Sequence, residues 1–390
     1  MNGALWAVAA SIHASAYVCA ASAVFGIGYT LLASVLIGRF FARAVAEPQH
    51  CPPVTVVKPL HGSEWALLHN LSTFCEQNYA GPVQFLFGVH DAADPALQTV
   101  DELRRLHPQA EITVIADASL YGPNRKISNI LNMLPHARHD VLVFADSDVG
   151  VGPDYLRNIV GELEKPDVGL VTCVYRGAPD PGFWPRLSAA ATHYQFLPGV
   201  VTGLALGLAR PCFGQTIAMR RATLEKIGGF MPFVRHLAED HAIGEAVRAT
   251  GETVAIPPML VAHACVESSA GKLLSHELRW SRTIRSVDPL GHLGSVFMHP
   301  LALALLAVAF SDGARWAWLI AALAVAARFA LKVGVDRALR RRQGGLWLMP
   351  IWDIVSFAIF VASFWSSRVR WRGFSFEVDS DGLLSAARDE

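Results

Sequence analysis

The chain has 390 residues, of which 52% are hydrophobic and only 17% are charged, and its formal net charge is zero. This composition is too apolar for an ordinary soluble enzyme and indicates membrane association, and the charge balance gives no reason to expect a nucleic-acid partner. The six cysteines form no CxxC pair, which disfavours a structural zinc site and a disulfide framework and fits a reducing, cytosolic compartment.

Residues 1–43 predict an N-terminal transmembrane helix. Residues 1–38 contain no Asp, Glu, Lys or Arg, which is ample for one span, and Arg39 and Arg43 follow. A cleaved signal peptide would carry positive charge before a shorter apolar run. By the positive-inside rule, we expect the N-terminus outside and the chain after Arg39 in the cytoplasm.

Residues 50–285 predict an α/β domain. Buried strands are expected at residues 54–58, 83–89, 111–116, 141–145 and 168–175, with helices at 65–75, 95–106, 125–133 and 154–163. This alternation predicts a mostly parallel, doubly wound, Rossmann-like sheet. No GxGxxG follows the first strand, so the usual dinucleotide fingerprint is absent. A nucleotide could still bind at the carboxyl ends of the strands, where the sequence places Lys58, His61, Asp91 and Asp94.

The stretch VLVFADSDVG, residues 141–150, ends a predicted strand with Asp146 and Asp148 on a turn. Ligands bind at this end of the strands in open α/β sheets. Two carboxylates with one residue between them can hold a hard divalent cation, and that cation can neutralise a diphosphate. The alternative is an ordinary Asp/Ser turn that closes a strand.

A basic helix start follows the third predicted strand. Asn124 is a candidate N-cap, and Arg125 and Lys126 come directly after it. Exposed N–H groups and cations at one place suit a phosphate, whereas the alternative is a solvated basic turn.

Residues 187–209 have no charged side chain but are interrupted by Pro198 and three glycines. A true span here would put the Asp146 turn and the later acids on opposite sides of the membrane. We therefore predict an interfacial helix and loop that presents a lipid hydroxyl, with His193 and Tyr194 as candidate acceptor contacts. A buried core segment of the domain is the alternative.

Glu239 and Asp240 fall at the first turn of a predicted helix, where they either complement the helix dipole or provide a base for an incoming hydroxyl. Further on, three arginines share one helical face beside Trp280. That face could contact lipid headgroups or hold a departing diphosphate. The arginines are Arg279, Arg282 and Arg285.

The C-terminal membrane region is expected at residues 286–367. Residues 289–311 are uncharged and long enough to cross, and residues 316–335 can return, with Arg328 and Lys332 snorkelling toward the cytoplasmic end. The uncharged stretch between Asp353 and Arg368 is short for a span, so we predict a re-entrant or interfacial helix there. Residues 368–390 then form a cytoplasmic tail, which contains Trp371-Arg372-Gly373.

These motifs together resemble a known family. Asp91 in GVHDAADPA, Asp146 and Asp148 in ADSDV, Asp240 in AEDH and Arg279-Trp280 in HELRW look like the D, D, D, (Q/R)xxRW set of membrane-bound, processive-type family-2 glycosyltransferases with a GT-A fold. KPLHG, FCEQNY, NRKISN, LARPCFG and RWSRTIRSVDP are similar to the ceramide glucosyltransferase-like branch, and most similar to its hopanoid-biosynthesis members. The resemblance covers residues 53–373, and His276 departs from the Gln or Arg of the pattern.

The resemblance implies an inverting transfer of N-acetylglucosamine from a UDP-sugar to the hydroxyl of the hopanoid bacteriohopanetetrol. Asp91 would contact the uracil or ribose, Asp146 would face the nucleotide, Asp148 would bind Mg²⁺ or Mn²⁺, and Asp240 would be the base. A sugar-nucleotide site would also include Lys58. The cation, Lys126 and Arg279 would stabilise the leaving diphosphate, and Trp280 would belong to the catalytic set. The expected location is the inner, cytoplasmic membrane, with several spans and a cytoplasmic catalytic domain.

Three other functions remain open. A ceramide glucosyltransferase using UDP-glucose is the nearest, since the residue chemistry does not separate a C2 hydroxyl from a C2 acetamido group. A polymer synthase that extrudes its product would need more spans to form a channel. A membrane-anchored nucleotide-sugar binding or scaffold protein is the candidate outside catalysis.

Overall fold

The computed structural model of the chain describes residues 2–342, 345–365, 368–371, 374–378 and 384–386. The chain divides into two compact units, each built from three segments. The membrane unit comprises Met1–Ala42, Pro181–Arg210 and Glu267–Arg370. The α/β unit comprises Arg43–Asp180, Pro211–Val266 and Trp371–Glu390. Two parts of the expected 50–285 domain therefore group with the membrane helices.

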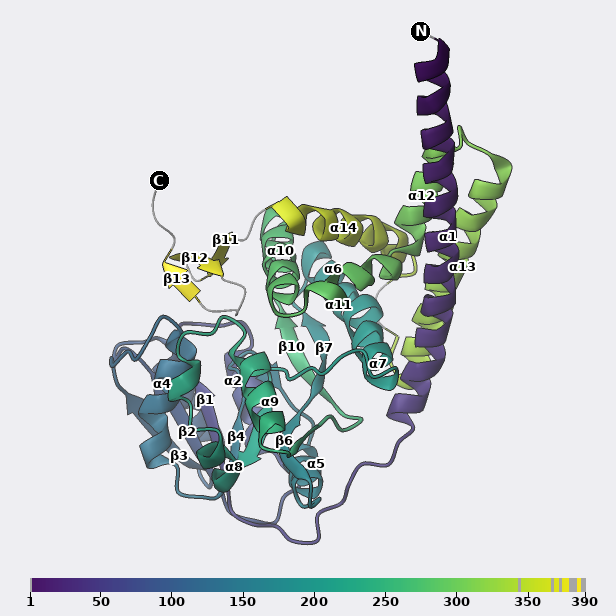
Figure 1. Cartoon of the computed structure of the whole chain (residues 1–390). Coiled ribbons are helices and arrows are strands. Elements are labelled where there is room, and N and C mark those ends of the chain that lie inside the picture. Colours follow the sequence, from purple (N-terminus) through teal and green to yellow (C-terminus); the bar gives the residue numbers. More distant parts are fainter. Residues whose placement is uncertain (1, 343–344, 366–367, 372–373, 379–383, 387–390) are drawn as a thin grey trace. The chain divides into compact units, whose positions relative to one another are not determined.

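A seven-stranded sheet forms the centre of the α/β unit (Figure 1). Its order is β3-β2-β1-β4-β8-β6-β9, and all neighbours are parallel except β8, which is antiparallel to β4 and β6. The mostly parallel sheet predicted from the sequence is therefore confirmed. The strands are β1 (Val54–Pro59), β2 (Val83–Val89), β3 (Glu111–Ala116), β4 (Val141–Phe144), β6 (Val168–Thr172), β8 (Ile217–Arg220) and β9 (Thr253–Ala255).

The register of β1 and β4 sets the position of the predicted acidic turn. Val54 lies opposite Val141 and Val57 opposite Phe144, so both strands end at the same edge of the sheet. Every residue of β4 is buried, as expected for a strand covered on both faces. Lys58 and Asp146 consequently come together at one carboxyl edge, although they are far apart in the sequence.

The helices predicted in the first part of this unit are present, each within two residues of the expected bounds. The side-chain oxygen of Asn124 accepts a hydrogen bond from the Ile127 N–H at 3.1 Å, so the predicted N-cap of α4 is confirmed. Apolar residues of α4 and α9 pack on the sheet, with Ile127, Phe144 and Ile243 in one core cluster. The helical elements are α2 (Leu67–Cys75), α3 (Ala96–Leu106), α4 (Arg125–Met133), η1 (Leu134–His136), α5 (Tyr155–Leu163), α8 (Arg221–Lys226), η3 (Met231–Phe233) and α9 (Glu239–Ala249).

Part of one predicted strand belongs to a second sheet, which has three strands. The single strand expected at residues 168–175 divides at Cys173 into β6 and β7 (Val174–Pro179). The latter strand pairs in parallel with β10 (Leu260–Cys265), which also pairs with β5 (Val149–Gly150). Every residue of the stretch 168–175 is buried on both sides of the division, so no change of pattern marks the break.

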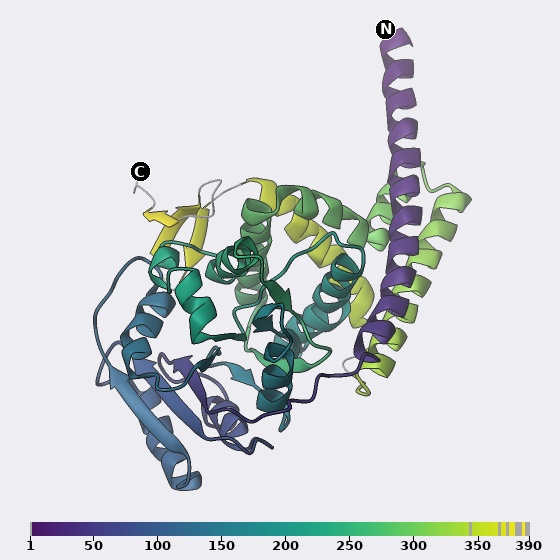
Figure 2. The same cartoon turned by 60° about the horizontal axis from the view of Figure 1, so that its bottom comes forward.

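The membrane unit contains a group of long helices. In both views α1 (Asn2–Phe41), α12 (Pro300–Phe310) and α13 (Arg315–Ala338) run side by side (Figures 1 and 2). Within the described residues, three helical stretches are long and apolar enough to cross a membrane: His13–Phe41, Arg315–Ala338 and Leu348–Trp365. The last covers α14 (Leu348–Ala362) and η5 (Ser363–Trp365), where a re-entrant or interfacial helix was predicted. That choice stays a prediction, since length and composition alone do not show a crossing.

The uncharged stretch expected to span as one piece is bent. The helical stretch Pro289–Met298 and α12 meet at 70°, which is a broken span or a re-entrant loop. Pro300 begins the second helix and has no N–H to donate, and His299 before it is not helical. The free N–H of Leu301 donates to the carboxylate of Asp353 at 2.9 Å instead. The first part consists of α11 (Pro289–Gly294) and η4 (Ser295–Met298).

The expected interfacial segment at residues 187–209 belongs to the membrane unit and is helical as far as Ala205. It runs through α6 (Phe183–Ala191), the π-helix η2 (Thr192–Phe196) and α7 (Leu197–Ala205), and α7 packs on α1. The same unit contains α10 (Ala270–Val287), which bears the predicted arginines. From the tail, the backbone of β11 (Arg368–Trp371), β12 (Phe374–Val378) and β13 (Leu384–Ala386) is described, while Arg372 and Gly373 of the predicted motif lie outside the described residues.

Candidate active site

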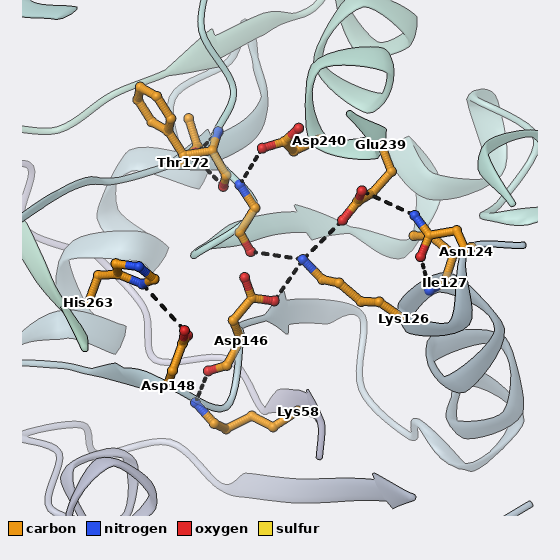
Figure 3. A network of polar contacts seen from close by, with 12 residues as sticks. Lys58, Asn124, Lys126, Ile127, Asp146, Asp148, Thr172, Glu239, Asp240 and His263 are labelled. Carbon is orange, nitrogen blue, oxygen red and sulfur yellow. Dashed lines mark hydrogen bonds and ion pairs between the residues drawn. The ribbon is translucent and has the colours of Figure 1, made fainter. Parts of the chain in front are cut away.

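A cluster of charged side chains lies where β1 and β4 end (Figure 3). The loop before α4 contributes Asn124, the helix itself Lys126, the turn after β4 Asp146, and the first turn of α9 Glu239 and Asp240. Parallel strands bring these loops to one edge, so acids almost a hundred positions apart in the sequence share one cluster.

Lys126 is the cation at the centre of this cluster. Its Nζ lies 2.7 Å from Asp146 Oδ1 and 3.1 Å from Glu239 Oε1, and donates to the Gly214 carbonyl at 3.4 Å. Burial by itself would lower the pKa of Lys126, but the attraction of Asp146, Glu239 and Asp240 outweighs burial and raises it. The amine therefore stays protonated and neutralises part of a concentrated negative charge.

Asn124 connects this cluster to the backbone. Its Oδ1 caps α4, and its Nδ2 donates to Glu239 Oε2 at 3.1 Å and to the His236 carbonyl at 3.1 Å. The side chain is fully buried. One amide therefore fixes the start of α4 and the orientation of the Glu239 carboxylate together.

Asp240 is held by two backbone donors. The Gly214 N–H donates to its Oδ2 at 2.9 Å, and the His241 N–H donates to its Oδ1 at 2.8 Å. Burial and the negative charge of Glu239 raise the pKa of Asp240 to about 6, although Lys126 and the two N–H groups oppose the rise. A carboxylate with this pKa is ionised at neutral pH and still basic enough to accept a proton.

The loop that contains Gly214 lies close to both Lys126 and Asp240. A Cβ atom on Gly214 would lie 3.1 Å from the Lys126 amine and 3.4 Å from the Asp240 carboxylate, so a side chain there would crowd both groups. The Thr172 hydroxyl donates to the Phe213 carbonyl and accepts from the Phe213 N–H, both at 2.9 Å. Thr172, the last residue of β6, thus holds the loop that contains Gly214 in place.

Lys58 lies beneath the acidic turn and is fully buried. Its amine donates to the Asp146 carbonyl at 2.7 Å and lies 3.8 Å from the centre of the Phe74 ring. Burial lowers the pKa of Lys58 to about 7, against the attraction of Asp146 and Asp148. The observed contacts of its amine hold the backbone of the turn, and a direct nucleotide contact by Lys58 stays a prediction.

Asp148, the predicted metal ligand, faces His263 of β10. Its Oδ2 lies 3.5 Å from His263 Nδ1, and its buried Oδ1 has no hydrogen-bond partner within the described part of the chain. A buried carboxylate oxygen without a donor suits a cation, so these two residues fit a divalent metal. Among the residues that the structure describes, no three His, Cys, Asp or Glu side chains converge on one metal position. Part of the coordination would therefore have to come from a diphosphate.

Asp91 lies at the end of β2 and is exposed, with its Oδ1 accepting from the Ala93 N–H at 2.9 Å. Asp94 is buried and accepts from the Gly62 N–H at 2.9 Å, and its other oxygen lies 3.4 Å from His61 Nδ1. Asp94 therefore links the ends of β1 and β2, and the nucleotide contact of Asp91 remains a prediction.

Four predicted residues belong to the membrane unit. Arg279 and Trp280 lie on α10, and His193 and Tyr194 lie in η2. The Tyr194 hydroxyl donates to Asp336 Oδ1 at 2.7 Å, and His193 Nδ1 lies 2.5 Å from the Ala189 carbonyl. Their roles in catalysis and acceptor binding stay predictions.

Sequence reasoning gave no role in the site to His263, Gly214 and the Glu239–Lys126 pair. A histidine in the apolar run LVAHAC was the only local signal for the first of these residues. Gly214 could not be distinguished from other loop glycines, because its contacts with α4 and α9 appear only after folding.

The mostly parallel α/β sheet, with the acidic turn at its carboxyl edge, is a GT-A-like glycosyltransferase fold, and this chain adds apolar helices to it. The mannosyltransferase PcManGT from Pyrobaculum calidifontis, solved in complex with GDP-Man and Mn²⁺, is similar to this chain with a TM-score of 0.51. At 22% identity it covers 91% of this chain and 99% of its own. This likeness supports the fold.

The chain belongs to glycosyl transferase family 21, whose model matches residues 18–384. It is 25% identical to ceramide glucosyltransferase 1 of Caenorhabditis elegans over 224 residues, which is 56% of this chain and 46% of the relative. It is 30% identical to a ceramide glucosyltransferase of Candida albicans over 121 residues, or 28% and 22% of the two chains. The chain thus spans about half or less of the length of these curated relatives.

Proposed function

We propose that the protein transfers a sugar, with inversion, from a UDP-sugar to the hydroxyl of a membrane lipid. The donor sugar proposed is N-acetylglucosamine and the acceptor is the hopanoid bacteriohopanetetrol. Ceramide glucosylation from UDP-glucose is the second candidate, because the named relatives are ceramide glucosyltransferases. We place the reaction at the cytoplasmic face of the inner membrane.

The observation that carries this proposal is the position of Asp240. A sugar or lipid hydroxyl has a pKa far above neutrality, so a carboxylate must take its proton as the oxygen attacks. Asp240 has a pKa raised to about 6 and is oriented by two N–H donors. A single displacement requires no second nucleophilic carboxylate. An α-linked donor then gives a β-glycoside.

The diphosphate gains negative charge as it leaves the sugar, so the site needs positive charge beside it. Lys126 is a permanently charged amine in the cluster, and we assign it to the diphosphate once a donor binds. Asp148 and His263 would hold Mg²⁺ or Mn²⁺, which supplies further positive charge to the phosphates. Asp146 would face the nucleotide and Asp91 its uracil or ribose, while Arg279 and Trp280 complete the proposed catalytic set.

The acceptor assignment is supported by the membrane unit. The apolar helices α6 and α7 join the candidate spans, and the chain returns from them to the loop of Gly214 beside Asp240. A lipid substrate accounts for this close sequence connection between apolar helices and the acid cluster. A nucleotide-sugar binding protein would not need a base tuned close to neutral pH.

The test is UDP release by the full-length chain in lipid nanodiscs. UDP-N-acetylglucosamine or UDP-glucose is supplied with bacteriohopanetetrol or ceramide, and mass spectrometry identifies the product lipid. Asp240→Asn should reduce turnover by about 100-fold or more, the range for loss of a general base, while UDP-sugar binding is largely kept.

Asp101→Asn is the matched control, since Asp101 pairs with Arg104 on the surface of α3. It should turn over like the unmodified chain. Normal turnover by Asp240→Asn would remove the base assignment. Donor binding without UDP release on any lipid would instead favour a binding protein.

A further inference from the structure

His276 stands at the first position of the (Q/R)xxRW pattern that the sequence resembles, and the structure shows what this histidine contacts. It lies on α10 of the membrane unit, and its Nδ1 is 2.5 Å from Oε1 of Glu267, the residue that begins the last segment of this unit. The carboxylate of Glu267 is buried, with only 8% of its side chain exposed. An ionised carboxylate can only accept a hydrogen bond, so Nδ1 is the donor in this contact.

Glu267 is the charged member of the local acids. Burial raises its pKa, but the hydrogen bond and charge of His276 outweigh burial and bring the pKa below the ordinary value. Burial and the charge of Glu267 raise the pKa of the neighbouring Glu277 to about 8, so Glu277 is mostly neutral at pH 7. One negative charge therefore faces His276, and the Ser188 side chain of α6 also lowers the pKa of Glu267.

The imidazole ring of His276 packs against the indole ring of Trp280. The two rings, four residues apart on α10, lie 4.7 Å from centre to centre with their planes at 76°. This edge-to-face arrangement favours one orientation of the indole. The Glu267 carboxylate holds the His276 ring in one orientation. That orientation determines which part of the imidazole contacts the indole of Trp280.

Trp280 also lies near an aromatic residue of the π-helix η2. Its ring centre lies 6.5 Å from that of Phe196, the last residue of η2. A π-helix is rare and is frequently associated with a functional position. The row Glu267–His276–Trp280–Phe196 therefore connects α10 to the uncharged segment in which a lipid acceptor was predicted to bind.

We propose that Glu267 and His276 form a positioning pair that orients Trp280 for the lipid acceptor. This inference rests on the proposed lipid acceptor. The four residues of the row belong to the membrane unit, whereas the cluster around Lys126 and Asp146 belongs to the α/β unit. Loss of the pair should consequently alter acceptor binding and leave donor binding unchanged.

The pair also explains the departure from the family pattern. Gln and Arg each offer N–H donors at this position and can form a hydrogen bond with a buried carboxylate, as the imidazole does. On this proposal, the residue at position 276 must offer a hydrogen-bond donor to the Glu267 carboxylate. A His276→Gln variant should retain the function of the pair, whereas His276→Phe keeps an aromatic ring but offers no donor.

The experiment measures KM for the lipid acceptor and for the UDP-sugar with the full-length chain in nanodiscs. His276→Phe should raise the acceptor KM by about tenfold, equivalent to about 1.4 kcal/mol, with a change below about twofold in the donor KM. Glu267→Leu should give the same pattern, and His276→Gln should restore the acceptor KM. Ser275→Ala, at an exposed neighbour on the same helix, is the matched control.

The outcomes separate this proposal from the proposed function. An unchanged acceptor KM in both His276→Phe and Glu267→Leu would overturn it, and so would an equal rise in both KM values. Failure of His276→Gln to restore binding, with the variant folded by its thermal unfolding curve, would overturn the donor requirement. Absence of UDP release by the unmodified chain would contradict the transferase function itself.

Discussion

At the scale of single residues, the charged cluster is organised around two acids with different tasks. Glu239 is bound by Asn124 and Lys126, whereas Asp240 is bound by two N–H groups. The neighbouring Glu239 charge contributes to the raised pKa of Asp240, because two close carboxylates resist simultaneous ionisation. Adjacent positions in the sequence thus give one carboxylate held by side chains and one carboxylate held by backbone N–H groups.

This arrangement predicts a specific pH dependence. Asp240 acts as a base only when ionised, so kcat/KM should be constant above its pKa of about 6 and fall about tenfold per pH unit below it. Glu239→Gln removes the neighbouring negative charge and should move this acidic limb to lower pH. The measurement is UDP release across about pH 4.5 to 8. A limb that does not move in Glu239→Gln would show that burial alone sets the pKa.

The part of the site that could be predicted consists of residues that lie close together in the sequence. Asp146 and Asp148 share one turn, and Asn124 and Lys126 share one helix start, so their grouping was readable from the chain. His263 and Gly214 reach the site only through sheet pairing and loop closure. Their contacts with Asp148 and Asp240 join residues that the sequence pattern does not connect.

At the scale of elements, α4 is the helix that joins the sheet to the cluster. Asn124 caps it and also contacts the segment before α9, so one side chain stabilises a helix end and a loop. The helix buries Ile127 and Ile130 against the sheet. Its first turn therefore cannot shift without moving Lys126.

Removing this cap should destabilise the α/β unit measurably. Asn124→Ala loses the bond to the Ile127 N–H and leaves Glu239 without one donor, which should cost about 1–2 kcal/mol. The expected fall in Tm of the full chain in detergent is several degrees, about 2–4 °C per kcal/mol. Asn124→Ser keeps a cap oxygen and should recover part of the loss. Equal Tm values for the Ala and Ser variants would show that the cap contributes little.

The elements also show where periodicity is informative. The bounds of β2, β3 and α4 were predicted to the residue. Gly81 and Pro82 directly precede β2, and Asn124 begins α4 as its cap. The division between β6 and β7 was missed, because every residue from Val168 to Tyr175 is buried and the chain changes sheets without a turn residue. Only pairing with β10 defines the second strand.

At the scale of the whole chain, the two units alternate along the sequence. Pro181–Arg210 separates Asp146 from Asp240 in the sequence yet belongs with the membrane helices. The chain therefore leaves the α/β unit and returns to it between the two acids. Hydropathy alone left open whether this segment was a span, an interfacial helix or domain core, because all three require an uncharged sequence.

The membrane unit contains a buried ion pair between α13 and α14. Asp353 seemed from the sequence to shorten the last apolar stretch, but its carboxylate accepts the Leu301 N–H and lies 3.2 Å from Arg328 Nε. Both side chains are almost completely buried. The ion pair thus joins α14 to α13 and caps the first turn of α12 beside Pro300.

A double-mutant cycle tests this role. Asp353→Leu alone leaves a buried arginine charge and an unsatisfied N–H, and Arg328→Met alone leaves a buried carboxylate. Each should cost about 3–5 kcal/mol, measured as a lower Tm of the full-length chain in detergent. The Arg328→Met/Asp353→Leu double variant removes both charges and should be less destabilised than either single variant. If the two losses simply add, the two charges do not interact, and the contact between Arg328 and Asp353 does not stabilise the membrane unit.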